Sequence, residues 1–318
     1  MGIPISVFAR EDLQTPEPVE EELTTRRTRQ KDKDKPFAPP GSGIRESDHV
    51  RSKLEAHLYR LREDEAYRRQ FSSYRRDALR KKFAQAEKLE EWLDQQNEPA
   101  PMRVRASNLK DCARWQAMSL MGFTPDPIGE DSPHWALAAE IGDRIHEDIE
   151  IALTWLQLSE KAEFRVKSEN NDFTGRVDHK LAGKSAILDV KSVKPEDFRK
   201  GAWADKVDSY VAQVSAYCRL TGCKTGVILM VDRGSGKLLE FEWDVDPVYA
   251  DLMLKRATKI VEYAKARRLP KAEERELHGG RETFICLRFC PFQRLCYEQE
   301  RFGSVQAALD AGADPKDL

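Results

Sequence analysis

The chain has 318 residues, and its 53 Lys and Arg residues nearly balance its 55 Asp and Glu residues. Charged residues make up 34% of the chain and the mean hydropathy is −0.67, so we expect part of the chain to lie outside any core. No apolar run reaches the ~18 residues of a membrane span, and the N-terminus lacks the pattern of a secretory signal. We therefore expect a cytoplasmic protein with no membrane partner.

The first hundred residues are predicted to lie outside the main domain. Residues 1–50 are rich in Pro, Glu, Lys, Arg and Thr, and they cannot bury enough apolar surface to offset the entropy of ordering, which predicts a disordered tail. Residues 51–97 carry apolar side chains at steps of three and four, which predicts a charged amphipathic helix or helical hairpin. Its basic face is interpreted as a solvated surface, with a DNA- or partner-binding arm as the alternative.

Residues 102–300 mix helical and strand patterns and are predicted to form one α/β domain, followed by a C-terminal tail at 301–318. Ser107 is expected to cap a first helix that runs to about Met121. A second helix, three strands, a third helix, two strands and a long helix are expected to follow. Their ranges are about 134–156, 163–167, 174–181, 185–192, 207–220, 225–231, 238–243 and 247–268.

Two carboxylates and a lysine occur on the first strands of this domain. Asp189 and Lys191 lie two residues apart, so on a strand they project to the same side. Asp178 lies eleven residues earlier, and on a neighbouring strand its carboxylate would meet that of Asp189. Two hard oxygen ligands beside open water positions suit Mg²⁺ or Mn²⁺. By spacing alone the same pattern also fits carboxylates that are solvated or paired, but buried strands rarely end in a charged pair without a reason.

Two flanking helices carry further polar candidates. His146 precedes the carboxylate strands, as a nitrogen ligand to the same ion would. Gln213 and Tyr217 lie at i and i+4 on one helical face after those strands. Each of these residues has a structural alternative, since a lone helical histidine or tyrosine is commonly part of a core.

The segments GDRIHEDIE, GRVD, LDVKS and QVSAY together resemble the RecB-like nucleases of the PD-(D/E)XK superfamily, which include CRISPR-associated and phage exonucleases with iron–sulfur clusters. Over about residues 105–300, the resemblance implies a restriction-endonuclease-like core with a mixed central sheet flanked by helices. It also implies roles in metal binding, in assisting the attacking water and in placing the substrate strand. These roles fall on His146, Asp178, Asp189 and the carbonyl of Val190 for the metal, Lys191 for the water, Gln213 and Tyr217 for the strand, and Glu163 in support.

Four of the six cysteines form a second pattern. Cys112 lies far upstream of the triplet Cys286, Cys290 and Cys296, and iron–sulfur clusters can draw thiolates from distant segments. This arrangement resembles that of the iron–sulfur RecB-like nucleases and implies a [4Fe–4S] cluster that fastens the first helix to the last segment. The spacing between the first two triplet cysteines is three residues, where that family usually has two, and a four-thiolate zinc site is the alternative. Cys218 and Cys223 are interpreted as packing residues.

The expected activity is metal-dependent hydrolysis of DNA at its ends, in phage recombination, repair or CRISPR adaptation with a partner protein. A sequence- or structure-specific endonuclease and a non-catalytic iron–sulfur DNA-binding or assembly subunit are the alternatives. Cations with an aromatic residue suit a single strand, through phosphate contacts and base stacking. The segment after the predicted strand of Asp189 and Lys191 contains such a set. The candidate DNA contacts are Lys194, Arg199, Lys200 and Trp203, with an ordinary charged loop as the alternative.

Overall fold

The computed structural model describes residues 43–94, 102–126, 133–200, 207–271, 286, 290–297 and 299–317. Residues 1–42 of the predicted tail lie outside this part of the chain, and for them the tail stays a prediction. Within the described ranges, no helix combines the length and apolar character needed to span a membrane. The ordered elements belong to one unit that runs from Phe37 to Leu318.

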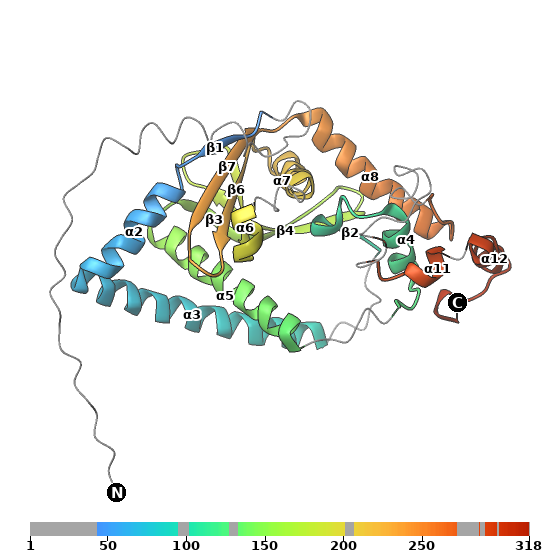
Figure 1. Ribbon diagram of the computed structural model, residues 1–318, viewed down its shortest axis with the longest axis horizontal. Coiled ribbons are helices and arrows are strands. Elements are labelled where there is room, and N and C mark those ends of the chain that lie inside the picture. Colours follow the sequence, from blue (N-terminus) through green and yellow to red (C-terminus); the bar gives the residue numbers. More distant parts are fainter. Residues whose placement is uncertain are drawn as a thin grey trace, which may run out of the picture. The chain divides into compact units, whose positions relative to one another are not determined.

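A seven-stranded mixed sheet forms the centre of this unit (Figure 1). Its strand order is β1-β7-β6-β5-β4-β2, and β3 pairs with β4. The pairs β5–β6 and β2–β4 are parallel, and the other neighbours are antiparallel. The strands are β1 (Arg45–Ser47), β2 (Val104–Arg105), β3 (Ser159–Lys167), β4 (Phe173–Leu181), β5 (Ala186–Val193), β6 (Thr225–Asp232) and β7 (Leu238–Asp244).

Helices cover both faces of the sheet, because its central strands carry apolar side chains on both sides. On β6, Ile228 and Met230 pack with residues of α7 (Val207–Thr221) and α8 (Pro247–Lys265), while Val227 and Leu229 pack toward the other face. That second face is covered by α2 (Arg51–Glu63) and α5 (Pro133–Trp155), as Figure 1 shows. The mixed sheet flanked by helices confirms the fold class expected from the sequence at this level.

The N-terminal extension is helical, as predicted, but the ordered chain begins before it. Strand β1 pairs with β7, and Val50 is buried, so the expected boundary of the tail at residue 50 is wrong. Glu240 of β7 is buried and accepts hydrogen bonds from the backbone amides of Val50 (2.8 Å) and Arg51 (2.6 Å). This carboxylate stabilises the N-terminus of α2, where unpaired amides and the helix dipole favour a negative charge. The longer helix α3 (Glu65–Asp94) follows.

The first helix of the main domain is shorter than predicted. Residues Ala106–Asn108 form a 3-10 turn, η1, and α4 (Ala113–Met121) begins only after Cys112, so Ser107 does not cap it. Helix α4 ends at Gly122, whose positive φ of 85° suits a residue without a Cβ. Against α4 pack α11 (Gln293–Tyr297) and α12 (Gln299–Asp310), which includes part of the predicted C-terminal tail. A short 3-10 turn, η3, covers residues 315–317.

Candidate active site

The candidate site lies at a gap along one edge of β4. Strand β2 pairs with β4 at Phe173 and Thr174, and β5 pairs with it at His179 and Lys180. Because β3 occupies the opposite edge, residues 175–178 face the gap between β2 and β5. At this point the Asp178 carboxylate accepts a hydrogen bond from the backbone amide of Val190 at 2.8 Å. Strands β4 and β5 therefore separate at the point where Asp178 and Asp189 lie.

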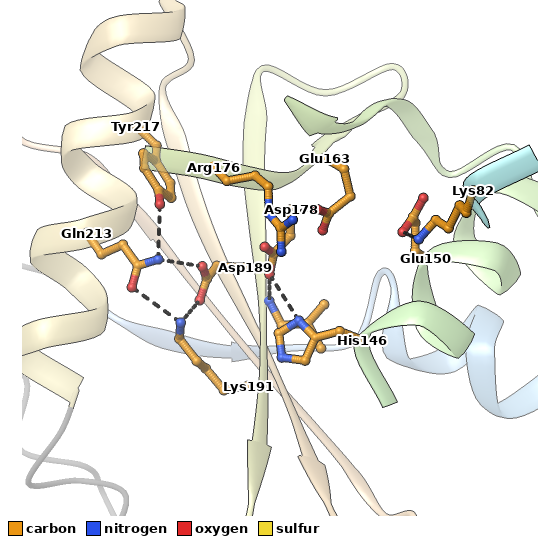
Figure 2. Close-up of polar contacts among 11 residues, drawn as sticks. Lys82, His146, Glu150, Glu163, Arg176, Asp178, Asp189, Lys191, Gln213 and Tyr217 are labelled. Carbon is orange, nitrogen blue, oxygen red and sulfur yellow. Dashed lines mark hydrogen bonds and ion pairs between the residues drawn. The ribbon is translucent and has the colours of Figure 1, made fainter. Parts of the chain in front are cut away.

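A chain of polar contacts fixes the catalytic candidates of β5 against α7 (Figure 2). Lys191 Nζ lies 2.7 Å from Asp189 Oδ2, as expected for residues on the same side of a strand. The Gln213 amide donates to Asp189 Oδ1 (3.0 Å) and to the hydroxyl of Tyr217 (3.2 Å), and its oxygen accepts from Lys191 (3.3 Å). These contacts set the amide orientation, because its nitrogen faces the carboxylate and its oxygen faces the ammonium.

Burial perturbs the ionisation of Asp178 and of the neighbouring histidine. Asp189 is only 1% exposed. Burial, reinforced by the nearby Asp189 charge, raises the pKa of Asp178 to about 8. Burial also lowers the pKa of His146, whose Nδ1 lies 3.7 Å from Asp178 Oδ2, and keeps this imidazole in the neutral form that binds metals. Figure 2 shows Asp178 between Asp189 and His146.

Glu163 lies on β3 directly beside these groups. The register pairs Ala162 with His179 and Phe164 with Val177, which places Glu163 opposite Asp178. Its φ of 50° is in the left-handed region, which costs about 1–3 kcal/mol for such a residue. Arg176 contacts its carboxylate at 2.8 Å. Burial raises the pKa of Glu163, with Arg176 acting in the opposite direction. The supporting position proposed for Glu163 is consistent with this placement.

An open cleft of about 2000 Å³ reaches the site from one side. His146, Asp178, Gln213 and Tyr217 line it, whereas the more deeply buried Asp189 does not. Across the part of the chain that the structure describes, no three His, Cys, Asp or Glu side chains are gathered closely enough to hold one metal ion. The residues expected to bind a metal therefore lie in one region but not close enough together to hold an ion as they stand.

The described part of the predicted DNA-contact segment does not line this cleft. Lys194 immediately precedes α6 (Pro195–Lys200), a short helix that the sequence did not predict. Arg199 is exposed and bonds within that helix to the Pro195 carbonyl at 3.2 Å. Lys194 and Arg199 are not among the cleft-lining residues. The side chain of Lys200 and the whole of Trp203 lie outside the described residues, so their roles stay predictions.

The four cysteines of the second pattern, all within the described residues, influence one another electrostatically but are not placed closely enough to hold one metal ion. Cys112 precedes Ala113 at the N-terminus of that helix, and the other three lie in the segment leading into and through α11. Burial raises the pKa of the Cys290 thiol to about 12, and the thiols of Cys296, Cys112 and Cys286 act in the same direction. Arg114, itself buried, donates to Cys296 Sγ at 3.6 Å.

The sequence analysis did not identify three residues that contribute to the site: Tyr210, Gly175 and Arg176. The Lys191 ammonium lies 5.0 Å from the ring centre of Tyr210, one helical turn before Gln213 on α7. Gly175 lies so close to Tyr217 that a Cβ there would be 2.4 Å from the tyrosine ring. The helical spacing of Tyr210, Gln213 and Tyr217 could have revealed the first. The close approach of Gly175 and the Arg176–Glu163 pair have no local sequence signal.

No family model and no curated protein matches the sequence. Three solved structures are similar to the fold. The crystal structure of SSO0001 gives a TM-score of 0.43 at 17% identity, over 68% of this chain and 95% of that one. A phage related exonuclease from Haemophilus somnus 129PT gives 0.39 at 15% identity, over 52% and 95%. An alkaline exonuclease from Laribacter hongkongensis gives 0.35 at 12% identity, over 56% and 93%. Likeness at this level does not establish a shared activity.

Proposed function

We propose that this protein is a Mg²⁺- or Mn²⁺-dependent nuclease with a PD-(D/E)XK core, which hydrolyses phosphodiester bonds at DNA ends. The observation that carries the proposal is the meeting of Asp178 and Asp189 at the gap between strands, with His146 and Lys191 beside them. A buried acidic pair with an attached ammonium needs a reason, because burying like charges is costly. A divalent cation and an anionic substrate supply one.

The residues present fit such an ion. Asp189 Oδ2 is buried and receives no hydrogen bond of normal geometry, and its contact is the Lys191 ammonium. Asp178, Asp189, the neutral imidazole of His146 and the carbonyl of Val190 would hold the ion. When bound, a divalent ion would polarise the scissile phosphate and lower the pKa of an attacking water.

The protein's own residues supply the remaining electrostatics. Burial lowers the pKa of Lys191, but Asp189 outweighs it and the net pKa is raised, so the side chain stays an ammonium. It can offset negative charge that develops on the phosphate. Gln213 holds both Lys191 and Asp189, and Tyr217 holds Gln213. The α7 residues therefore act as positioning groups for the charged pair.

The first test is digestion of 5′- and 3′-labelled single- and double-stranded DNA with and without Mn²⁺. Asp189→Asn and Lys191→Met should each lower the rate by roughly 100-fold or more, the usual loss when one transition-state contact is removed. Asp251→Asn is the matched control, because this acid forms a surface pair with Arg219. Melting temperatures verify that each variant folds. Full activity in both site variants would refute the assignment.

Substrate topology separates the exonuclease from its alternatives. An exonuclease degrades linear DNA and leaves closed circular DNA intact, whereas an endonuclease cuts both. A non-catalytic DNA-binding subunit binds DNA and digests neither form under any metal condition. Digestion of linear DNA alone is the expected result.

We also propose that Cys112, Cys286, Cys290 and Cys296 hold a [4Fe–4S] cluster. Support comes from the electrostatic effect of the other three thiols on Cys290 and from the Arg114 guanidinium, a buried cation beside Cys296 that suits thiolate charge. Protein purified anaerobically should be brown, with broad absorbance near ~400 nm, and Cys112→Ser should lose iron. A colourless protein with one zinc per chain would favour the four-thiolate zinc site instead.

A further inference from the structure

The cleft at the candidate site has a wall that the proposed chemistry does not use. Helix α3 contributes Lys82 and Phe83 to its lining, and the segment Met102–Arg105 contributes another side. The same cleft contains His146 and Asp178. The N-terminal extension and the metal-donor residues therefore face one continuous space.

Among the described residues, three arginines that line this cleft have no acidic partner. Where α5 lines the cleft, charges are mostly paired, as in Arg144 with Glu147. Arg103, Arg105 and Arg165 also line it, and none has an ion pair with another residue within the described ranges. The Arg103 Nε is buried and has no hydrogen-bond partner there. These three side chains are available to bind an anion.

The strand register places two arginines directly opposite each other. Arg165 of β3 pairs with Arg176 of β4, and both line the cleft. Like charges directly opposite on neighbouring strands are destabilising. Glu163 neutralises Arg176 at 2.8 Å, which leaves Arg165 as the uncompensated member. A phosphate bound at Arg165 would relieve this repulsion.

Apolar side chains are exposed in the same cleft. Phe83 is 59% exposed and Met102 is 38% exposed, although both are large and apolar. Cationic groups interleaved with an exposed aromatic ring suit a single nucleic-acid strand, whose phosphates and base faces are both accessible. The stacked bases of a duplex present no faces for such a ring. This combination favours an unpaired strand as the occupant.

Helix α3 is held in a defined position beside the cleft. Arg75 bonds to Asp148 of α5 at 2.8 Å, and Lys82 forms an ion pair with Glu150, shown in Figure 2. Tyr67 accepts a hydrogen bond from Trp155 of α5 at 2.9 Å. The position of Phe83 is therefore fixed before a ligand arrives, which reduces the entropy lost on binding.

We propose that the N-terminal extension is a substrate-binding element: Phe83 of α3, with Arg103, Arg105 and Arg165, holds a single DNA strand that leads to Asp178. Phe83 stacks on a base and the arginines contact phosphates. This inference deepens the proposed nuclease function and rests on it for the identity of the strand. It assigns a role to the extension that differs from the solvated surface favoured by its sequence.

The experiment measures binding of 5′-fluorescein-labelled oligo(dT) by the full-length protein, by fluorescence anisotropy with EDTA in place of metal. Phe83→Ala should weaken binding roughly fivefold or more, the lower end of the loss of one stacked base. Arg105→Ala and Arg165→Ala should each reduce the slope of log K against log salt by about 0.7, the value for one phosphate of a single strand. A duplex of equal length should lose less affinity with Phe83→Ala.

Two variants outside the cleft serve as matched controls. Tyr59→Ala removes an exposed aromatic ring from α2, and Arg80→Ala removes an exposed cation from α3. Both should bind oligo(dT) as tightly as the unmodified protein. Unchanged binding by Phe83→Ala and Arg165→Ala, or no strand binding by the unmodified protein, would overturn the inference. Tight, cleft-dependent binding without any digestion would instead refute only the proposed nuclease function.

Discussion

Replacing Gly175 by alanine tests whether the close packing of β4 on α7 holds the site together. The new Cβ would lie 2.4 Å from Tyr217 Cε1, 2.7 Å from its hydroxyl oxygen and 2.8 Å from the Ala106 Cβ, far inside van der Waals contact. Tyr217 is only 2% exposed, so a shift of its ring would disturb the packing around it. Overpacking of this kind costs about 1–3 kcal/mol, and loss of the hydrogen bond to Gln213 costs about 1 kcal/mol more.

The consequence should be visible in both stability and chemistry. At about 2–4 °C per kcal/mol for a domain of this size, the melting temperature of Gly175→Ala should fall by roughly 4–16 °C. DNA digestion should fall as well, because Gln213 loses the contact that orients it toward Asp189. The assays are thermal unfolding followed by circular dichroism and the initial rate of digestion at a temperature where the variant is folded.

Two comparisons separate this explanation from general damage. In a Tyr217→Leu background, Gly175→Ala should cost much less stability, because the main clashing ring is gone. Gly226→Ala places a Cβ 2.4 Å from the ring of Trp243, away from the site, and should lower stability while the folded fraction keeps its rate. A Gly175→Ala protein as stable and as active as the unmodified one would refute the reasoning.

Two further predictions concern stability. Glu240→Ala leaves two amides at the start of α2 without an acceptor and should lower the free energy of unfolding by about 2–5 kcal/mol. Urea titrations measure this loss, and a change below about 1 kcal/mol would contradict the role of Glu240 at the start of α2. His57 is buried, and its burial, with a smaller effect of Arg60, lowers its pKa below the ordinary value of about 6.5. As the pH falls below about 6.5, the unfolded chain binds a proton that folded His57 does not, so stability decreases. The urea midpoint of His57→Leu should therefore decline less between pH 7 and pH 5 than that of the unmodified protein, and parallel declines would rule this histidine out.

The central elements could be predicted because their signals are local. The strands from residue 159 to 244 and the helices α5, α7 and α8 carry clear periodicities, and their observed bounds differ only slightly from those expected. The start of α4 was misplaced because Ser107 has the side chain of a cap, whereas its backbone belongs to a 3-10 turn. Strands β1 and β2 have three and two residues, too short for any alternation to be seen.

In the candidate site, too, the residues with a local sequence signal could be predicted and the others could not. Asp178, Asp189 and Lys191 could be picked out because a charged pair after a buried strand is unusual within the sequence itself. Helical spacing placed Gln213 and Tyr217 on one helical face, and the structure joins Gln213 both to Asp189 and to Tyr217. The cleft wall could not be found in this way, since Phe83 and Arg165 lie on elements far apart in the sequence. Their shared surface depends on tertiary packing.

The pairing of β1 with β7 has a consequence for how the chain is made. Arg45 and Glu242 are 197 positions apart, yet they lie side by side in the sheet. At ribosomal rates of about 5–20 residues per second, the first strand waits roughly 10–40 s for its partner to be synthesised. During that interval α2 has no carboxylate at its N-terminus, and the apolar side chains that it later buries are exposed. Pairing of β1 is therefore a late, long-range step, and truncation before β7 would remove both the partner of β1 and the acceptor at the start of α2, leaving the contacts with α5 to hold the extension.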